Sequence, residues 1–135
     1  KAVVSIGAVK GVEIGDGFEA SKSHGSSNND AFTCQNGVVI KKTNHAGGIL
    51  GGMSDGSELI LRAAFKPTPS ISKEQQTINT AFEDTTIAIT GRHDPVVVPR
   101  AVVVVESMAA ITILDQMMIN MSAKMDALEA FYCKE

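Results

Sequence analysis

Residues 91–108, GRHDPVVVPRAVVVVESM, decide the fold, because they place three polar groups directly before the most apolar run of the chain. Arg92 offers a planar set of donors for a phosphate or carboxylate, His93 can titrate near neutrality, and Asp94 can act as a base, a cap or an acceptor. Pro99 suits the first turn of a helix, and a helix N-terminus attracts anions. The same spacing also fits a purely structural arrangement, in which Arg92 and Asp94 pair across a turn and Asp94 caps the helix.

The apolar run continues through residues 101–125, AVVVVESMAAITILDQMMINMSAKM. Its valines favour a strand, but its length and its content of Met, Ala and Leu favour a helix. The few polar residues are scattered around the helical wheel, so we expect sheets or a partner chain to cover this helix on most sides. The charged tail, residues 126–135, is expected to fray.

Composition limits the classes of function. A length of 135 residues predicts one domain, and a net charge of -3 with 4% aromatic residues argues against nucleic-acid binding. Arg100, Glu106 and Asp115 interrupt the apolar run, which predicts a soluble protein without a membrane span. Cys34 and Cys133 lie far apart without metal-ligand spacing, which predicts no metal site and a reducing, cytoplasmic location.

The remaining chain is expected to be rich in strands and turns. Residues 3–14, VVSIGAVKGVEI, predict one or two strands, in which Gly7 and Ala8 either let a ligand approach the main chain or form a bulge. The other expected segments are a turn at 15–17, a mobile polar loop at 21–37 with a turn at Asn36-Gly37, strands at 38–43, 57–65 and 85–90, and a polar connector at 72–84.

Two further stretches carry possible chemistry. The glycine loop, residues 44–57 (NHAGGILGGMSDGS), contains five glycines, which suit a hairpin, a planar ligand lying against the main chain, or both. In residues 65–71, FKPTPSI, Lys66 precedes the hydroxyls of Thr68 and Ser70 between stiffening prolines, an arrangement suited to a phosphate and equally to an ordinary rigid loop.

Taken in order, four stretches resemble the C-terminal part of chorismate synthase. They are VKGVEIGDGF at 9–18, NHAGGILGGMSDG at 44–56, KPTPSI at 66–71 and GRHDPVVVPRAV at 91–102. The resemblance covers nearly the whole chain, residues 1–135, as a single portion of that domain. It implies an α+β fold, a β-α-β sandwich with helices between two antiparallel sheets, and a homotetramer when the protein is full length.

The resemblance also implies a reaction and a cofactor. The reaction is an anti-1,4-elimination of phosphate from 5-enolpyruvylshikimate 3-phosphate to give chorismate, a step of the shikimate pathway; it requires reduced FMN, and the family is associated with NADP. The implied flavin contacts are Gly7, Ala8 and Gly51, and the implied FMN-phosphate contacts are Lys66, Pro67, Thr68, Pro69 and Ser70. Arg92 would face both flavin and substrate phosphate, and Asp94 would lie near the reactive part of the isoalloxazine.

The sequence departs from the family in length. The family's N-terminal Gly-Glu-Ser-His-Gly motif is missing, and Ser23-His24-Gly25 does not replace it. We therefore expect a C-terminal fragment that carries about half of the flavin site and is inactive alone. Two alternatives remain, namely a sandwich module that serves assembly, and a phosphate-ester hydrolase that uses His93 and Asp94, for which no nucleophile-base arrangement is visible.

Overall fold

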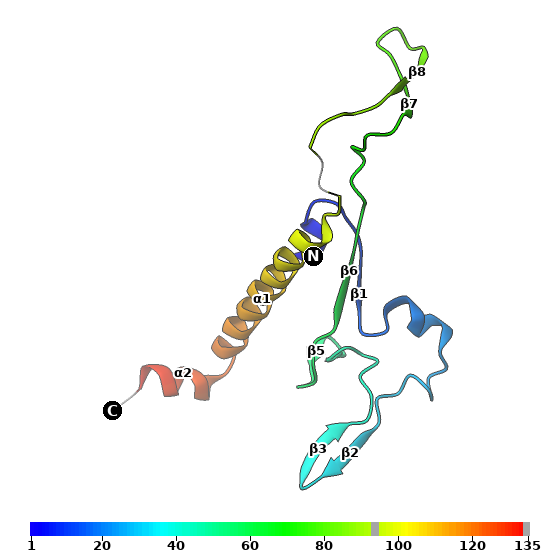
Figure 1. Cartoon of the computed structure of the whole chain (residues 1–135). Helices are drawn as coiled ribbons and strands as arrows, with labels where there is room; N and C mark the ends of the chain where they lie inside the picture. Colours follow the sequence, from blue (N-terminus) through cyan, green and yellow to red (C-terminus); the bar gives the residue numbers. More distant parts are fainter. Residues whose placement is uncertain (93–94, 134–135) are drawn as a thin grey trace. The chain divides into compact units, whose positions relative to one another are not determined.

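The computed structural model describes residues 1–92 and 95–133, and Figure 1 shows their helices and strands. By its internal contacts, the chain divides into two compact units. Unit 1 comprises Lys1–Ala8 and Phe65–Glu135, and unit 2 comprises Val9–Ala64. The described strands pair in four two-stranded sheets, β1 with β6, β2 with β3, β4 with β5, and β7 with β8. The fold is thus built from small sheets and two α-helices.

Unit 2 is a succession of short strands and turns. Its elements are β1 (Val9–Ile14), the 3-10 helix η2 (Gly17–Lys22), β2 (Phe32–Gln35), β3 (Val38–Lys41), β4 (Ile49–Leu50), β5 (Met53–Ser54) and β6 (Leu61–Phe65), which ends at the unit boundary. The expected strand at 57–65 therefore begins only at Leu61. Residues 3–14 contain one strand, because Val3–Ser5 form the 3-10 helix η1 of unit 1.

The β2–β3 hairpin confirms the turn predicted at Asn36-Gly37. Both residues have positive φ, 52° and 79°, as a two-residue hairpin turn of the primed type requires. The antiparallel register runs outward from this turn, with Gln35 opposite Val38 and Phe32 opposite Lys41. The prediction of a loop throughout 21–37 was wrong, because cross-strand pairing orders a segment that its polar composition assigns to coil.

Unit 1 contains a second hairpin where a connector was expected. Strands β7 (Gln75–Ile78) and β8 (Asp84–Ile87) are antiparallel. The Asn79 side chain organises their turn, since its Oδ1 accepts hydrogen bonds from the amides of Ala81 at 2.8 Å and Glu83 at 3.0 Å. Residues 72–84, which were expected to be a polar connector, thus contain strand β7 and the turn of the hairpin. The strand predicted at 85–90 corresponds to β8, which begins one residue earlier and ends at Ile87.

The long apolar helix is confirmed as α1 (Val98–Ser122), and Pro99 lies in its first turn. Its N-cap residue is Val97, which makes no side-chain cap bond. Ala101 is the only described residue of α1 that is buried, and the expected cover of this helix by sheets or a partner chain stays a prediction. The tail was also predicted wrongly, because Met125–Tyr132 form the helix α2.

By length and composition alone, α1 is long and apolar enough to cross a membrane, although it contains Arg100, Glu106 and Asp115. The expectation of a soluble protein without a membrane span stays a prediction. The core helix of a soluble protein meets the same criterion, so this finding alone does not favour a membrane.

Candidate functional site

In unit 1, the KPTPSI stretch and the segment around Arg92 meet at one cavity. The cavity has a volume of about 590 Å³, and the described residues that line it are Pro67, Thr68, Ser70, Ile71, Ser72, Gly91 and Pro95. The structure therefore brings together two motifs about 20 positions apart in sequence. Lys66, Pro69 and Arg92 are not among these described lining residues, and Asp94, like His93, lies outside the described residues.

The Gly7-Ala8 segment is held beside the start of KPTPSI. The Lys66 amide donates a hydrogen bond of 2.8 Å to the Ala8 carbonyl. Ala8 has a φ of 69°, a left-handed conformation that costs a residue with a side chain about 1–2 kcal/mol. Apart from its chain neighbours, no atom of the described residues lies within 4 Å of the place where a Cβ on Gly7 would be, so the main chain at Gly7 is accessible.

Two cations of the candidate site are available to an anion. The side chains of Lys66 and Arg92 are exposed, and neither has a hydrogen-bond or ion-pair partner among the described residues. Thr68 and Ser70, by contrast, are half-buried and present hydroxyl groups. A phosphate monoester is bound by positive charge plus hydrogen-bond donors, and these four residues carry both kinds of group.

One residue that holds the KPTPSI stretch, Gln75, was not predicted from the sequence. The amide Nε2 of Gln75, at the start of β7, donates a hydrogen bond of 3.1 Å to the Pro69 carbonyl. In the sequence, Gln75 is one glutamine in a polar segment, which does not indicate a role in the site. Its position beside Pro69 became visible only with the pairing of β7 and β8.

The glycine loop lies in unit 2 and combines two kinds of glycine. Gly47 is buried with a φ of 64°, and a Cβ there would overlap the backbone of Gly15. Gly51 forms the turn between β4 and β5 with a φ of 59°, and among the described residues only its chain neighbours come within 4 Å of its Cβ position. The loop is therefore a tight hairpin whose tip exposes its main chain.

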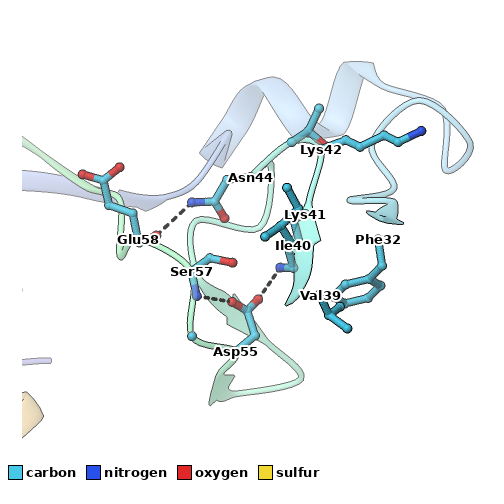
Figure 2. Close-up of a pocket in the computed structure, with 11 residues that line it drawn as sticks. Phe32, Val39, Ile40, Lys41, Lys42, Asn44, Asp55, Ser57 and Glu58 are labelled. Atoms are coloured by element: carbon cyan, nitrogen blue, oxygen red, sulfur yellow. Dashed lines mark hydrogen bonds and ion pairs between the residues drawn. The ribbon is translucent and has the colours of Figure 1, made fainter. Parts of the chain in front are cut away.

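Charged side chains hold the glycine loop, and sequence reasoning missed them. Lys41, at the end of β3, forms an ion pair with Asp55 (Figure 2). It forms a second ion pair, at 3.9 Å, with Asp30. The pKa of Asp55 is lowered from 3.8 to about 2, chiefly by the hydrogen bond from Lys41 and further by hydrogen bonds from Ser57. Burial raises the pKa of Asp30, but hydrogen bonds from Ala46, His45 and Thr43 outweigh it and leave the pKa lowered. Both carboxylates are therefore ionised near neutrality.

These groups border a second cavity, of about 740 Å³, within unit 2. Its described lining comprises Phe32, Val39, Ile40, Lys41, Lys42, Thr43, Asn44, Asp55, Gly56, Ser57 and Glu58. Figure 2 shows Lys41 and Asp55 pointing toward one another and Asn44 pointing to the Glu58 backbone, where its Nδ2 donates to the carbonyl at 2.8 Å. Several polar groups here are already satisfied by other protein groups. In the part of the chain that the structure describes, no cluster of three His, Cys, Asp or Glu could hold a metal.

A family model described as chorismate synthase matches residues 1–118. The chain belongs to the chorismate synthase family. Chorismate synthase of Agathobacter rectalis is 63% identical over 134 residues, which are 99% of this chain and 36% of that protein. Chorismate synthase of Methanococcus vannielii is 55% identical over 117 residues, 86% of this chain and 31% of that protein.

A crystal structure of chorismate synthase resembles the fold with a TM-score of 0.66 at 33% identity, covering 89% of this chain and 29% of that chain. The small antiparallel sheets and the helices agree with the predicted α+β class, whereas the sandwich arrangement stays a prediction. The chain spans about a third of the length of the curated chorismate synthases it matches.

Proposed function

We propose that this chain is the part of a chorismate synthase that supplies one portion of the flavin and substrate site. The reaction would be the anti-1,4-elimination of phosphate from 5-enolpyruvylshikimate 3-phosphate, and the cofactor would be reduced FMN. The observation that carries the proposal is the cavity that Thr68 and Ser70 share with Gly91 and Pro95. It joins the two motifs to which the family resemblance assigns phosphate binding and catalysis.

The residues present fit the phosphate end of FMN. Thr68 and Ser70 line the cavity with hydroxyl groups, and Lys66 adds an exposed cation at the start of the same rigid stretch. Pro67 and Pro69 restrict the backbone, so that few conformations are lost on binding. The accessible main chain at Gly7, the positive-φ residue Ala8 and, in unit 2, the hairpin tip at Gly51 are assigned to the ring from the resemblance.

Arg92 and Asp94 are assigned the chemical roles. A guanidinium such as that of Arg92 binds a phosphate through two parallel hydrogen bonds and stabilises the negative charge on a departing phosphate. Asp94 would lie near the reactive part of the isoalloxazine. Reduced FMN, when bound, supplies an electron-rich ring that stabilises charge developing during C–O cleavage.

The remaining parts of the proposal concern the whole protein. A cytoplasmic homotetramer is expected, in which the exposed apolar surface of α1 is covered in a β-α-β sandwich. Burying that surface is favourable by about 25 cal/mol per Å² of apolar area, which gives a physical reason for the cover. This chain alone would be inactive.

Substitution of the two cations tests the assignment in the full-length protein. We expect Lys66→Ala and Arg92→Ala each to weaken the binding of reduced FMN about tenfold or more, since each removes a charged hydrogen-bond donor. Lys73→Ala, an exposed lysine of the same unit outside the cavity lining, is the matched control. Affinities of both variants equal to that of the control would refute the assigned contacts.

A second function, a sandwich module that serves assembly without flavin, is favoured by the exposed apolar surface of α1. Size-exclusion chromatography with light scattering, combined with thermal melting, separates the two. A stable oligomer whose melting temperature ignores FMN supports the module, and a melting temperature that rises with FMN supports the site.

A further inference from the structure

The entry of the glycine loop is fixed by one carboxylate. Asp30 accepts hydrogen bonds from the Thr43 hydroxyl at 2.8 Å and from the amides of His45 at 2.7 Å and Ala46 at 3.0 Å. The Asp30 side chain is only 7% exposed. Three donors from one short segment, residues 43–46, therefore converge on one carboxylate.

The exit of the loop is fixed by a second carboxylate. The Asp55 amide donates a hydrogen bond of 3.1 Å to the Gly48 carbonyl and closes the base of the β4–β5 hairpin. The Asp55 carboxylate accepts a hydrogen bond of 2.9 Å from the Ser57 amide. The turn at Gly51 lies at the tip of the hairpin that Gly48 and Asp55 close.

Lys41 connects entry and exit. Its Nζ forms an ion pair with Asp55 and lies 3.9 Å from Asp30, and its side chain is 7% exposed. One cation thus faces two carboxylates, whose side chains are 7% and 14% exposed, at the border of a cavity. Removing the cation would leave both carboxylates without the partner that joins them.

We propose that Lys41, Asp30 and Asp55 form a clamp that positions the glycine loop, so that its tip presents the Gly51 main chain in one geometry to the flavin. Lys41 is a positioning residue, because it acts on Gly51 through Asp55 and the hairpin. The role toward flavin rests on the proposed function, whereas the clamp itself rests only on contacts within unit 2.

The test compares Lys41→Met and Asp55→Asn with Lys42→Met in the full-length protein. Lys42 is the exposed neighbour of Lys41 and has no ion-pair partner among the described residues, so its substitution removes the same charge without opening the clamp. Asp55→Asn keeps the size of the side chain and serves if Lys41→Met does not fold. Lys41→Arg, which keeps the positive charge, is the rescue variant.

Two measurements test separately whether the clamp holds the loop and whether the held loop strengthens FMN binding. In hydrogen exchange without flavin, we expect the Gly48 and Asp55 amides to exchange roughly tenfold faster in Lys41→Met and Asp55→Asn than in Lys42→Met, because the loop opens more often. In flavin titrations, we expect the dissociation constant for reduced FMN to rise about tenfold in the same variants, as loss of outer-shell support commonly causes. Lys41→Arg should restore both readouts at least in part.

Each outcome decides a different claim. Unchanged exchange in the clamp variants overturns the clamp. Faster exchange with unchanged FMN affinity overturns the positioning role and leaves the proposed function intact. Absence of FMN binding in the unsubstituted full-length protein overturns the proposed function, while the exchange result still decides the clamp.

Discussion

At the residue scale, the glycines of the glycine loop serve two physical purposes. Gly47 allows two backbone segments to touch, because a Cβ would overlap the backbone of Gly15. Gly51 allows a turn with positive φ and has open space around it. The cost of adding a methyl group should therefore differ strongly between the two positions.

This difference is testable with Gly47→Ala and Gly51→Ala. Gly51→Ala adds only the strain of a left-handed backbone and should lower the free energy of unfolding of the full-length protein by about 1 kcal/mol. Gly47→Ala adds an overlap with backbone and should lower it by about 3 kcal/mol or more. Urea denaturation measures both, and equal losses would contradict the packing role of Gly47.

The ion pair of Lys41 and Asp55 predicts a pH dependence. The folded pKa of Asp55 is about 2, below the ordinary value of 3.8, chiefly because Lys41 donates a hydrogen bond to it. A lowered folded pKa contributes stability that is complete above about pH 4 and is lost as the pH falls toward 2. The difference in unfolding free energy between the unsubstituted protein and Asp55→Asn should therefore shrink from pH 5 to pH 2. A difference that stays constant over this range would argue against the ion pair.

At the element scale, β7 supports the KPTPSI stretch from the side. Gln75 begins this strand and bonds the Pro69 carbonyl, so the hairpin of β7 and β8 ties a site loop to regular structure. Prolines stiffen the stretch itself, and the glutamine fixes where it sits. A hairpin outside the family motifs thereby contributes to the candidate site.

Substitution of Gln75 tests this support. Gln75→Leu removes a hydrogen bond, which typically contributes about 0.5–1.5 kcal/mol, so FMN binding to the full-length protein should weaken about two- to tenfold. Gln76→Leu, at the next and exposed position of β7, is the control. If both variants bind FMN equally well in fluorescence titrations, Gln75 has no part in holding the stretch.

At the scale of the whole molecule, the exposed apolar side chains of α1 bear on the stability of this chain when it is produced alone. The helix is apolar, and Ala101 is its only described residue that is buried. The curated relatives are about three times as long, so most of each relative has no counterpart in this chain. Surface that stays exposed contributes no hydrophobic stabilisation.

Two outcomes follow for the 135-residue chain produced by itself. It should bind a dye specific for exposed apolar surface, and it should bind reduced FMN at least about tenfold more weakly than the full-length protein, because part of the contacts is missing. Dye fluorescence and flavin titration measure these properties. Stoichiometric FMN binding as tight as that of the full-length protein would show that this chain holds a complete flavin site.

The sequence by itself determined the family, the long helix after Pro99, the turn at Asn36-Gly37 and the motifs of the candidate site. These features are local, since a proline, a pair of turn residues or a run of apolar residues restricts its own backbone. It could not predict the β7–β8 hairpin, the helix α2 or the bond from Gln75 to Pro69. Nor could it show that Lys41 joins Asp30 and Asp55, which are 25 positions apart. Only the tertiary structure decided these contacts, because which groups leave water together depends on how distant segments pair.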